Sequence, residues 1–150
     1  MAKTAAMRTI DKAVAAVIRE TDGRAQLLVF QHPTAGVQLP KGTIEPDESI
    51  ALATLRELEE ESGLTLDGPP HYIGTWERVV RAGETHPWHV SILQAPPGLP
   101  EQWEHSAVGS PEEDGLIFAF HWLDMDAALP GKLHPVFTDV SLMLLDHLQK

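Results

Sequence analysis

Residues 42–64 read GTIEPDESIALATLRELEEESGL, and the architecture of the chain follows from this stretch. A loop after Gly42 leads into a run of acids around Arg56, and Gly63 closes the run. Acidic clusters are common, but one that contains an arginine and lies between two spaced glycines is not. The pattern predicts a loop that leaves a strand and enters a helix from about Asp47 to Ser62, which Gly63 ends as a left-handed cap residue.

Carboxylates are expected on one face of that helix. An α-helix turns by about 100° per residue, so Glu57, Glu60 and Glu61 project to one side, whereas Glu59 points nearly the other way. A glutamate-rich face is usually solvated surface, but the flanking pattern favours a site. Three unneutralised acids would repel one another. Because oxygen donors suit Mg²⁺ or Mn²⁺, we expect a divalent-metal site here.

This stretch resembles the Nudix box, G-x5-E-x7-R-E-U-x-E-E-x-G-U, where U is a bulky aliphatic residue. Each fixed position is matched, by Gly42, Glu48, Arg56, Glu57, Leu58, Glu60, Glu61, Gly63 and Leu64. Outside the box, the run Leu39-Pro40-Lys41 and the order of strands and helices resemble the family more loosely. The resemblance implies an α/β fold, a Nudix-type α/β/α sandwich with a central mixed β-sheet. It also implies hydrolysis of a nucleoside diphosphate linked to another moiety.

The resemblance further implies roles for individual residues. The metal ligands would be Glu57, Glu60, Glu61 and the backbone carbonyl of Lys41. Arg56 would orient the carboxylates through charge-assisted hydrogen bonds. Glu48 would hold the loop against the helix, although an acid that favours the helix macrodipole explains it almost as well.

The chemistry agrees with these roles. A pyrophosphate is polyanionic, and a divalent ion can neutralise its oxygens, orient the bond and lower the pKa of the attacking water. We expect Glu57 to act as the general base, with Arg56 and Glu61 completing the catalytic set.

Segment 95–115 has no clear periodicity and is predicted to be a long loop. Loops of this length in a compact domain are usually functional or disordered. Family members often draw a further carboxylate from just ahead of a late strand, which implies Glu112 or Glu113 here, and we assign Glu113. An ordinary acidic surface loop is the alternative.

Substrate contacts are less marked in the sequence. Lys41 could reach a phosphate. Arg78 and Arg81 lie at odd spacing on a strand, so they point to opposite faces and at most one faces the site; we assign Arg78. Tyr72, Trp76 and Trp88 could stack a base, but aromatic residues on strands are more often core. For His86 and His89 we expect structural or substrate-polar roles rather than metal binding.

Composition bounds the function. At 150 residues with 43% hydrophobic residues, the chain is expected to form one globular domain over residues 1–150. Its formal net charge of −11 argues against nucleic acid as a partner. The chain contains no cysteine, which is compatible with a cytoplasmic location. Residues 1–20 do not resemble a signal peptide, and the apolar run 13–18 is too short to cross a membrane.

Periodicity and turn signals predict an alternating order of elements. The expected strands are Lys12–Arg19, Ala25–Gln31, Val37–Leu39, Tyr72–Val80, Trp88–Gln94 and Leu116–Leu123, and a closing helix is expected over Pro135–Leu148. Beside the acids of the first helix, Ala51, Leu55 and Leu58 form an apolar stripe that would seat it on the core.

The substrate stays open at this point. The run Leu39-Pro40-Lys41-Gly42 resembles the entry to the box in diadenosine polyphosphate hydrolases. A dinucleoside polyphosphate is therefore the first candidate for the substrate. A mutator-type nucleoside triphosphate pyrophosphohydrolase is the main alternative, and a non-catalytic regulator that binds a nucleotide or ADP-ribose is a weaker one. The partner is a small-molecule nucleotide, and the oligomeric state is open, with a homodimer among the options.

Overall fold

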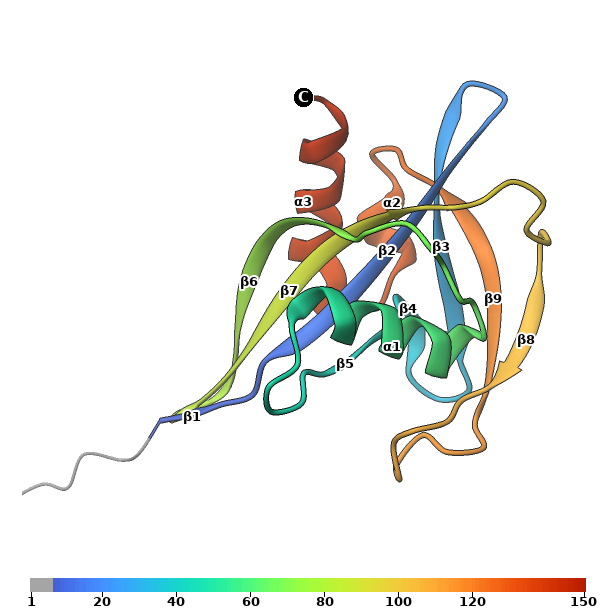
Figure 1. The fold of residues 1–150 in the computed structure, drawn as a ribbon. Helices are drawn as coiled ribbons and strands as arrows, with labels where there is room; N and C mark the ends of the chain where they lie inside the picture. Colours follow the sequence, from blue (N-terminus) through green and yellow to red (C-terminus); the bar gives the residue numbers. More distant parts are fainter. Residues whose placement is uncertain (1–6) are drawn as a thin grey trace, which may run out of the picture.

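The computed structural model describes residues 7–150 (Figure 1). The expectation about a signal peptide concerns in part residues 1–6, which lie outside the described residues. The strands are β1 (Arg8–Thr9), β2 (Lys12–Thr21), β3 (Arg24–His32), β4 (Gly36–Gln38), β5 (Lys41–Thr43), β6 (His71–Arg81), β7 (Glu84–Gln94), β8 (Trp103–Ser106) and β9 (Ile117–Asp124). The helices are α1 (Ile50–Ser62), α2 (Leu129–Lys132), the 3₁₀ turn η1 (Pro135–Phe137) and α3 (Thr138–Leu148).

The strands form one mixed sheet, as expected. Its main path runs β1-β7-β2-β3-β9-β8, and β4, β5 and β6 pair with β3, β2 and β7. β2 is parallel to β7 and antiparallel to β3, and the β2–β3 hairpin turns at Asp22-Gly23, where both residues have positive φ. The box begins on β5, where Lys12 lies opposite Thr43 and Ala13 opposite Gly42. This register places the box loop beside the start of β2.

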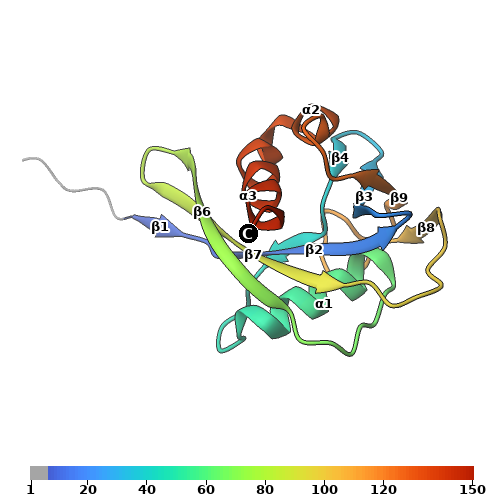
Figure 2. The same cartoon turned by 90° about the horizontal axis from the view of Figure 1, so that it is seen from above.

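The sheet is covered on both faces. α1 crosses one face, and α2 and α3 lie on the other (Figures 1 and 2). β2 and β3 are apolar at successive positions because their side chains alternate between two cores. Val14, Ala16, Leu27 and Val29 join the core under α2 and α3, and Ala15, Val17, Leu28 and Phe30 join the core under α1. The predicted α/β/α sandwich is therefore confirmed.

α1 begins three residues later than the sequence indicated. Asp47 has φ 65°, which is incompatible with a helix, and Ser49 is the N-cap whose hydroxyl accepts from the amide of Leu52 at 3.1 Å. The helix ends as predicted at Gly63, with φ 80°. The predicted apolar stripe is right at Leu58, which is fully buried, but wrong at Ala51, which is exposed.

The loop before β9 and the start of the closing helix differ from the sequence predictions. Segment 95–115 is not entirely loop, because Trp103–Ser106 pairs with β9 and the Trp103 ring stacks on Phe120 at 5.2 Å. The closing helix does not begin at Pro135: η1 comes first, capped by His134, and the α-helix starts at Thr138.

Within residues 7–150, none of the helices has the length and apolar character that crossing a bilayer requires.

Candidate active site

Arg56 connects the box loop to α1. Its Nε and Nη2 donate to the two carboxylate oxygens of Glu48 at 2.7 and 2.8 Å, and Nη2 also donates to the carbonyl of Thr43 at 3.0 Å. The fork geometry of arginine suits this two-point contact. Hydrogen bonding from Arg56 lowers the pKa of Glu48 to about 2, so Glu48 is ionised at neutral pH. The contact explains Glu48 as a residue that holds the loop.

The same arginine reaches the predicted metal carboxylates. Its Nη1 donates to Glu57 at 2.8 Å and to Glu60 at 3.3 Å. The Glu57 carboxylate lies directly over Gly42, where any Cβ would collide with it. The box therefore needs glycine at this position because of a close approach, not because of a special φ.

Glu61 lies deeper than Glu57. Its side chain accepts from the backbone amide of Lys41 at 2.7 Å, and the residue is only 3% exposed. Burial and the nearby charge of Glu113 raise the pKa of Glu61 well above its ordinary value. Burial also raises the pKa of Glu57, against the opposing effect of Arg56. Both carboxylates are thus costly to ionise unless a cation approaches them.

The loop between β8 and β9 brings a further acid to this group. The amide of Val108 donates to the carbonyl of Glu60 at 3.1 Å, which ties the loop to α1. Gly109 follows with φ 95°, and a Cβ on it would collide with the Glu60 carboxylate. Beyond this contact, Glu113 comes close enough for its charge to act on both Glu57 and Glu61.

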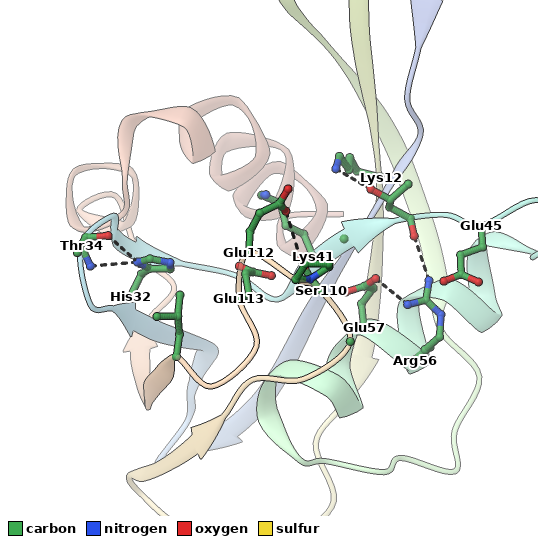
Figure 3. Close-up of a pocket in the computed structure, with 15 residues that line it drawn as sticks. Lys12, His32, Thr34, Lys41, Glu45, Arg56, Glu57, Ser110, Glu112 and Glu113 are labelled. Carbon is green, nitrogen blue, oxygen red and sulfur yellow. Dashed lines mark hydrogen bonds and ion pairs between the residues drawn. The ribbon is translucent and has the colours of Figure 1, made fainter.

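A cavity of about 690 Å³ opens between these elements (Figure 3). Its wall combines acids with bases, and these are Glu45, Glu57, Glu112 and Glu113 on the one hand and Lys12, Lys41 and Arg56 on the other. The ammonium of Lys12 donates to the hydroxyl of Thr43 at 2.7 Å, and burial together with nearby Lys41 lowers the pKa of Lys12. Glu60 and Glu61, which the sequence analysis counted among the metal ligands, are not among the residues that line this cavity.

The positions of the acidic side chains show how far the site is arranged for a metal ion. Across residues 7–150, no three His, Asp or Glu side chains stand close enough together to form a ready-made metal site. The box acids share one side of α1, but Glu57 and Glu60 turn to Arg56 whereas Glu61 turns to the amide of Lys41. Their chemistry nevertheless fits a hard cation, since they are oxygen donors and burial makes Glu57 and Glu61 costly to ionise alone.

Other residues that the sequence singled out lie elsewhere. The guanidinium of Arg78 lies over the Trp88 ring at 5.6 Å, and Arg78 does not line the cavity, whereas Arg81 pairs with Glu84. Trp88 is fully buried, as the core alternative predicted. His89 bonds to Thr75 and Asp11.

The sequence analysis did not single out several residues that line the cavity, and two of them with ionisable side chains are Lys12 and His32. Lys12 looked like an ordinary first residue of a strand, and His32 like the residue after one. Only the register of β2 with β5 and the turn between β3 and β4 bring them to the box.

Comparison with known proteins identifies the family. The NUDIX domain matches residues 9–141. The CTP pyrophosphohydrolase of Escherichia coli K12 is 37% identical over 109 residues, which cover 67% of this chain and 76% of that protein.

Solved structures share the fold. A MutT protein from Methanosarcina mazei Go1 superposes with a TM-score of 0.66 at 19% identity, covering 96% of this chain and 97% of the other. An Ap4A hydrolase from C. elegans gives 0.58 at 17% identity, covering 91% and 93%. At these identities the likeness establishes the fold alone.

The chain therefore belongs to the Nudix family, and it is a hydrolase that acts on phosphoanhydride bonds of nucleotides. Hydrolases of this family generally need divalent metal ions.

Proposed function

We propose that this Nudix hydrolase is a Mg²⁺- or Mn²⁺-dependent pyrophosphohydrolase that converts a nucleoside triphosphate into a nucleoside monophosphate and pyrophosphate. The observation that carries the proposal is one cavity whose wall combines the acids Glu57 and Glu113 with the bases Lys12 and Lys41. The choice of a triphosphate rests on the 37% identity to a CTP pyrophosphohydrolase.

In this proposal, Glu57, Glu60, Glu61 and the backbone carbonyl of Lys41 hold the divalent ion. The amide of Lys41 already bonds to Glu61, so the backbone at Lys41 adjoins the acids. When bound, the ion neutralises phosphate oxygens and lowers the pKa of a nearby water. Through its Nη1 contacts, Arg56 holds the carboxylates of Glu57 and Glu60 next to each other.

Glu57 is the proposed general base. Water oxygen bonds to phosphorus, the phosphoanhydride P–O bond breaks, the water proton passes to a carboxylate, and pyrophosphate leaves. In the absence of a cation, burial raises the pKa of Glu57 and Arg56 opposes this rise, whereas a bound cation would favour the ionised form that accepts a proton. Glu113 is proposed to complete the acidic cluster from the opposite loop.

Lys12 and Lys41 are proposed to bind the phosphate chain. Both are half-buried at the cavity wall, and burial, followed by the charge of nearby Lys41, lowers the pKa of Lys12. An anionic phosphate between two neighbouring ammonium groups relieves this repulsion. Arg78 lies over Trp88 and does not line the cavity, so it is a weaker candidate for substrate binding than the sequence suggested.

Dinucleoside polyphosphates are the second candidate. The run Leu39-Pro40-Lys41-Gly42 placed them first, and this order is now reversed because the CTP pyrophosphohydrolase shares far more sequence with the chain than four residues. Both candidate substrates contain a phosphate chain that Lys12 and Lys41 could contact.

A substrate panel tests the proposal. Purified protein is incubated with CTP, ATP, GTP, their deoxy forms, diadenosine tetraphosphate and ADP-ribose, each with Mg²⁺ or Mn²⁺. We expect the highest kcat/KM on a nucleoside triphosphate, with monophosphate and pyrophosphate as products and no turnover after chelation of the metal. Preferred cleavage of diadenosine tetraphosphate would instead establish the second candidate.

Residue roles are tested with a matched pair on one helix. Glu61→Gln should lower kcat by about a hundredfold or more, in the range seen when a single charge-stabilising group is removed from an active site. Glu59→Gln is the control, because Glu59 is exposed on the other side of α1. If both variants kept turnover within tenfold of the unmodified protein, the proposed metal site would be wrong. The role of Glu113 is tested in the same way, by comparing kcat of Glu113→Gln with that of Glu112→Gln. We expect the larger loss for Glu113→Gln.

A further inference from the structure

His32 lies at the end of β3 and presents one ring nitrogen to the cavity. Its Nδ1 accepts from the backbone amides of Thr34 and Ala35 at 3.0 and 3.1 Å. Since two N–H groups point at Nδ1, the proton of the neutral ring lies on Nε2. The turn therefore fixes both the tautomer and the direction of the ring, and Nε2–H is a donor that these contacts leave free.

The ring is also held in place from behind. Its centroid lies 5.3 Å from that of Phe118, which is fully buried in the core under α1. Of the fifteen cavity-lining residues in the described part of the chain, only His32 carries an aromatic ring. Among these lining residues, His32 is therefore the one against which a planar group in the cavity can stack.

The two ends of the cavity differ in their side chains. His32 and Thr34 lie at one side, and Glu112 and Glu113 stand in the middle (Figure 3). The other side holds Lys12 and Arg56 together with the acids Glu45 and Glu57. In the proposed function, this second side takes the phosphates, because it combines Lys12 with the proposed metal ligand Glu57. The side of His32 offers an uncharged N–H, a hydroxyl and an aromatic face, which match the neutral, planar and acceptor-rich end of a nucleotide.

We infer that His32 is a specificity-determining residue that recognises the nucleobase, donating Nε2–H to a base carbonyl oxygen or unprotonated ring nitrogen. The inference rests on the proposed function, because it assumes that the phosphates lie at Lys12 and the carboxylates. It assigns the base to the β3–β4 turn rather than to the aromatic residues of β6 and β7.

His32→Asn is the test variant, because the Asn side-chain oxygen can replace Nδ1 as acceptor for the turn while the Nε2–H donor is lost. His32→Gln is the complementary variant, since its amide can reach the place of Nε2. His134→Asn is the matched control: His134 also accepts a backbone amide at Nδ1, from Val136 at 3.0 Å, but it lies outside the cavity.

Dissociation constants are measured for an α,β-imido nucleoside triphosphate and for imidotriphosphate, which has no base, in Mg²⁺. We expect His32→Asn to weaken nucleotide binding about fivefold, the size of one neutral hydrogen bond, and to change imidotriphosphate binding by less than about twofold. His32→Gln should recover part of the loss, and His134→Asn should show none.

Equal losses for both ligands would place His32 on a phosphate and overturn the inference, as would no loss for either. If the unmodified protein bound the nucleotide no more tightly than imidotriphosphate, base recognition itself would be refuted. The proposed function fails separately, by absence of triphosphate turnover in the substrate panel. Turnover combined with an unaffected His32→Asn variant would reject this inference alone.

Discussion

Arg56 offers the sharpest test of how the site is held together. Its side chain makes hydrogen bonds to the carboxylates of Glu48, Glu57 and Glu60 and to the carbonyl of Thr43. The substitution Arg56→Gln removes the positive charge that these acids share, and Glu48 keeps the backbone amide of Glu45 as a donor. We expect a loss of stability together with a loss of order in the box loop.

The magnitude follows from burial. Breaking a fully buried ion pair by removing one partner costs about 3–5 kcal/mol. The side chain of Arg56 is 26% exposed and that of Glu48 is 15% exposed, so solvent screens part of this cost. We expect the free energy of unfolding to fall by about 2–3 kcal/mol at neutral pH, which lowers Tm by roughly 5–10 °C in a chain of this size.

The deficit should depend on pH. The pKa of Glu48 is about 2 in the folded protein against 4.5 ordinarily, so its ionised form stabilises the fold above pH 4.5. This contribution is lost as pH falls from 4.5 towards 2, because folded and unfolded states are then both protonated. The difference in stability between Arg56→Gln and the unmodified protein should therefore be smaller at pH 3.5 than at pH 7.

Urea denaturation followed by circular dichroism at both pH values measures the effect. Arg24→Gln is the control, because Arg24 pairs with Asp124 at 2.9 Å but is 58% exposed. Exposed pairs contribute about 0–1 kcal/mol. A deficit for Arg56→Gln no larger than that for Arg24→Gln would refute the reasoning.

Two further predictions concern the loop and the core. Gly109→Ala should lower kcat/KM by about tenfold to a hundredfold, because its Cβ would displace the Glu60 carboxylate or the loop. Gly98→Ala separates this effect from backbone strain, since Gly98 also has positive φ but open space around it; equal activity losses would contradict the steric argument. Leu58→Ala should cost about 2–5 kcal/mol in urea denaturation, because Leu58 is fully buried under the sheet. Leu142 on α3 is half-exposed, so the substitution Leu142→Ala should lower the free energy of unfolding by less than about 1 kcal/mol. A similar loss of unfolding free energy for both variants would place Leu58 outside the core.

The sequence alone identified the family, the mixed sheet between helical layers and the helix that carries the acids. These are local matters. A helix repeats every 3.6 residues, so the spacing of Glu57, Glu60 and Glu61 places them on one side wherever the helix packs. Gly63 ends the helix by its own backbone preference.

The tertiary structure decided which distant residues meet those acids. Lys12 reaches the site because β2 pairs with β5, and Glu113 reaches it because the loop before β9 bonds to the end of α1. His32 faces the cavity because the turn after β3 orients its ring. Strand register and loop docking depend on contacts between residues far apart in the chain, and no local spacing records them. The four-residue strand β8 was missed for the same reason, since its pairing partner and the packing of Trp103 define it rather than any pattern of its own.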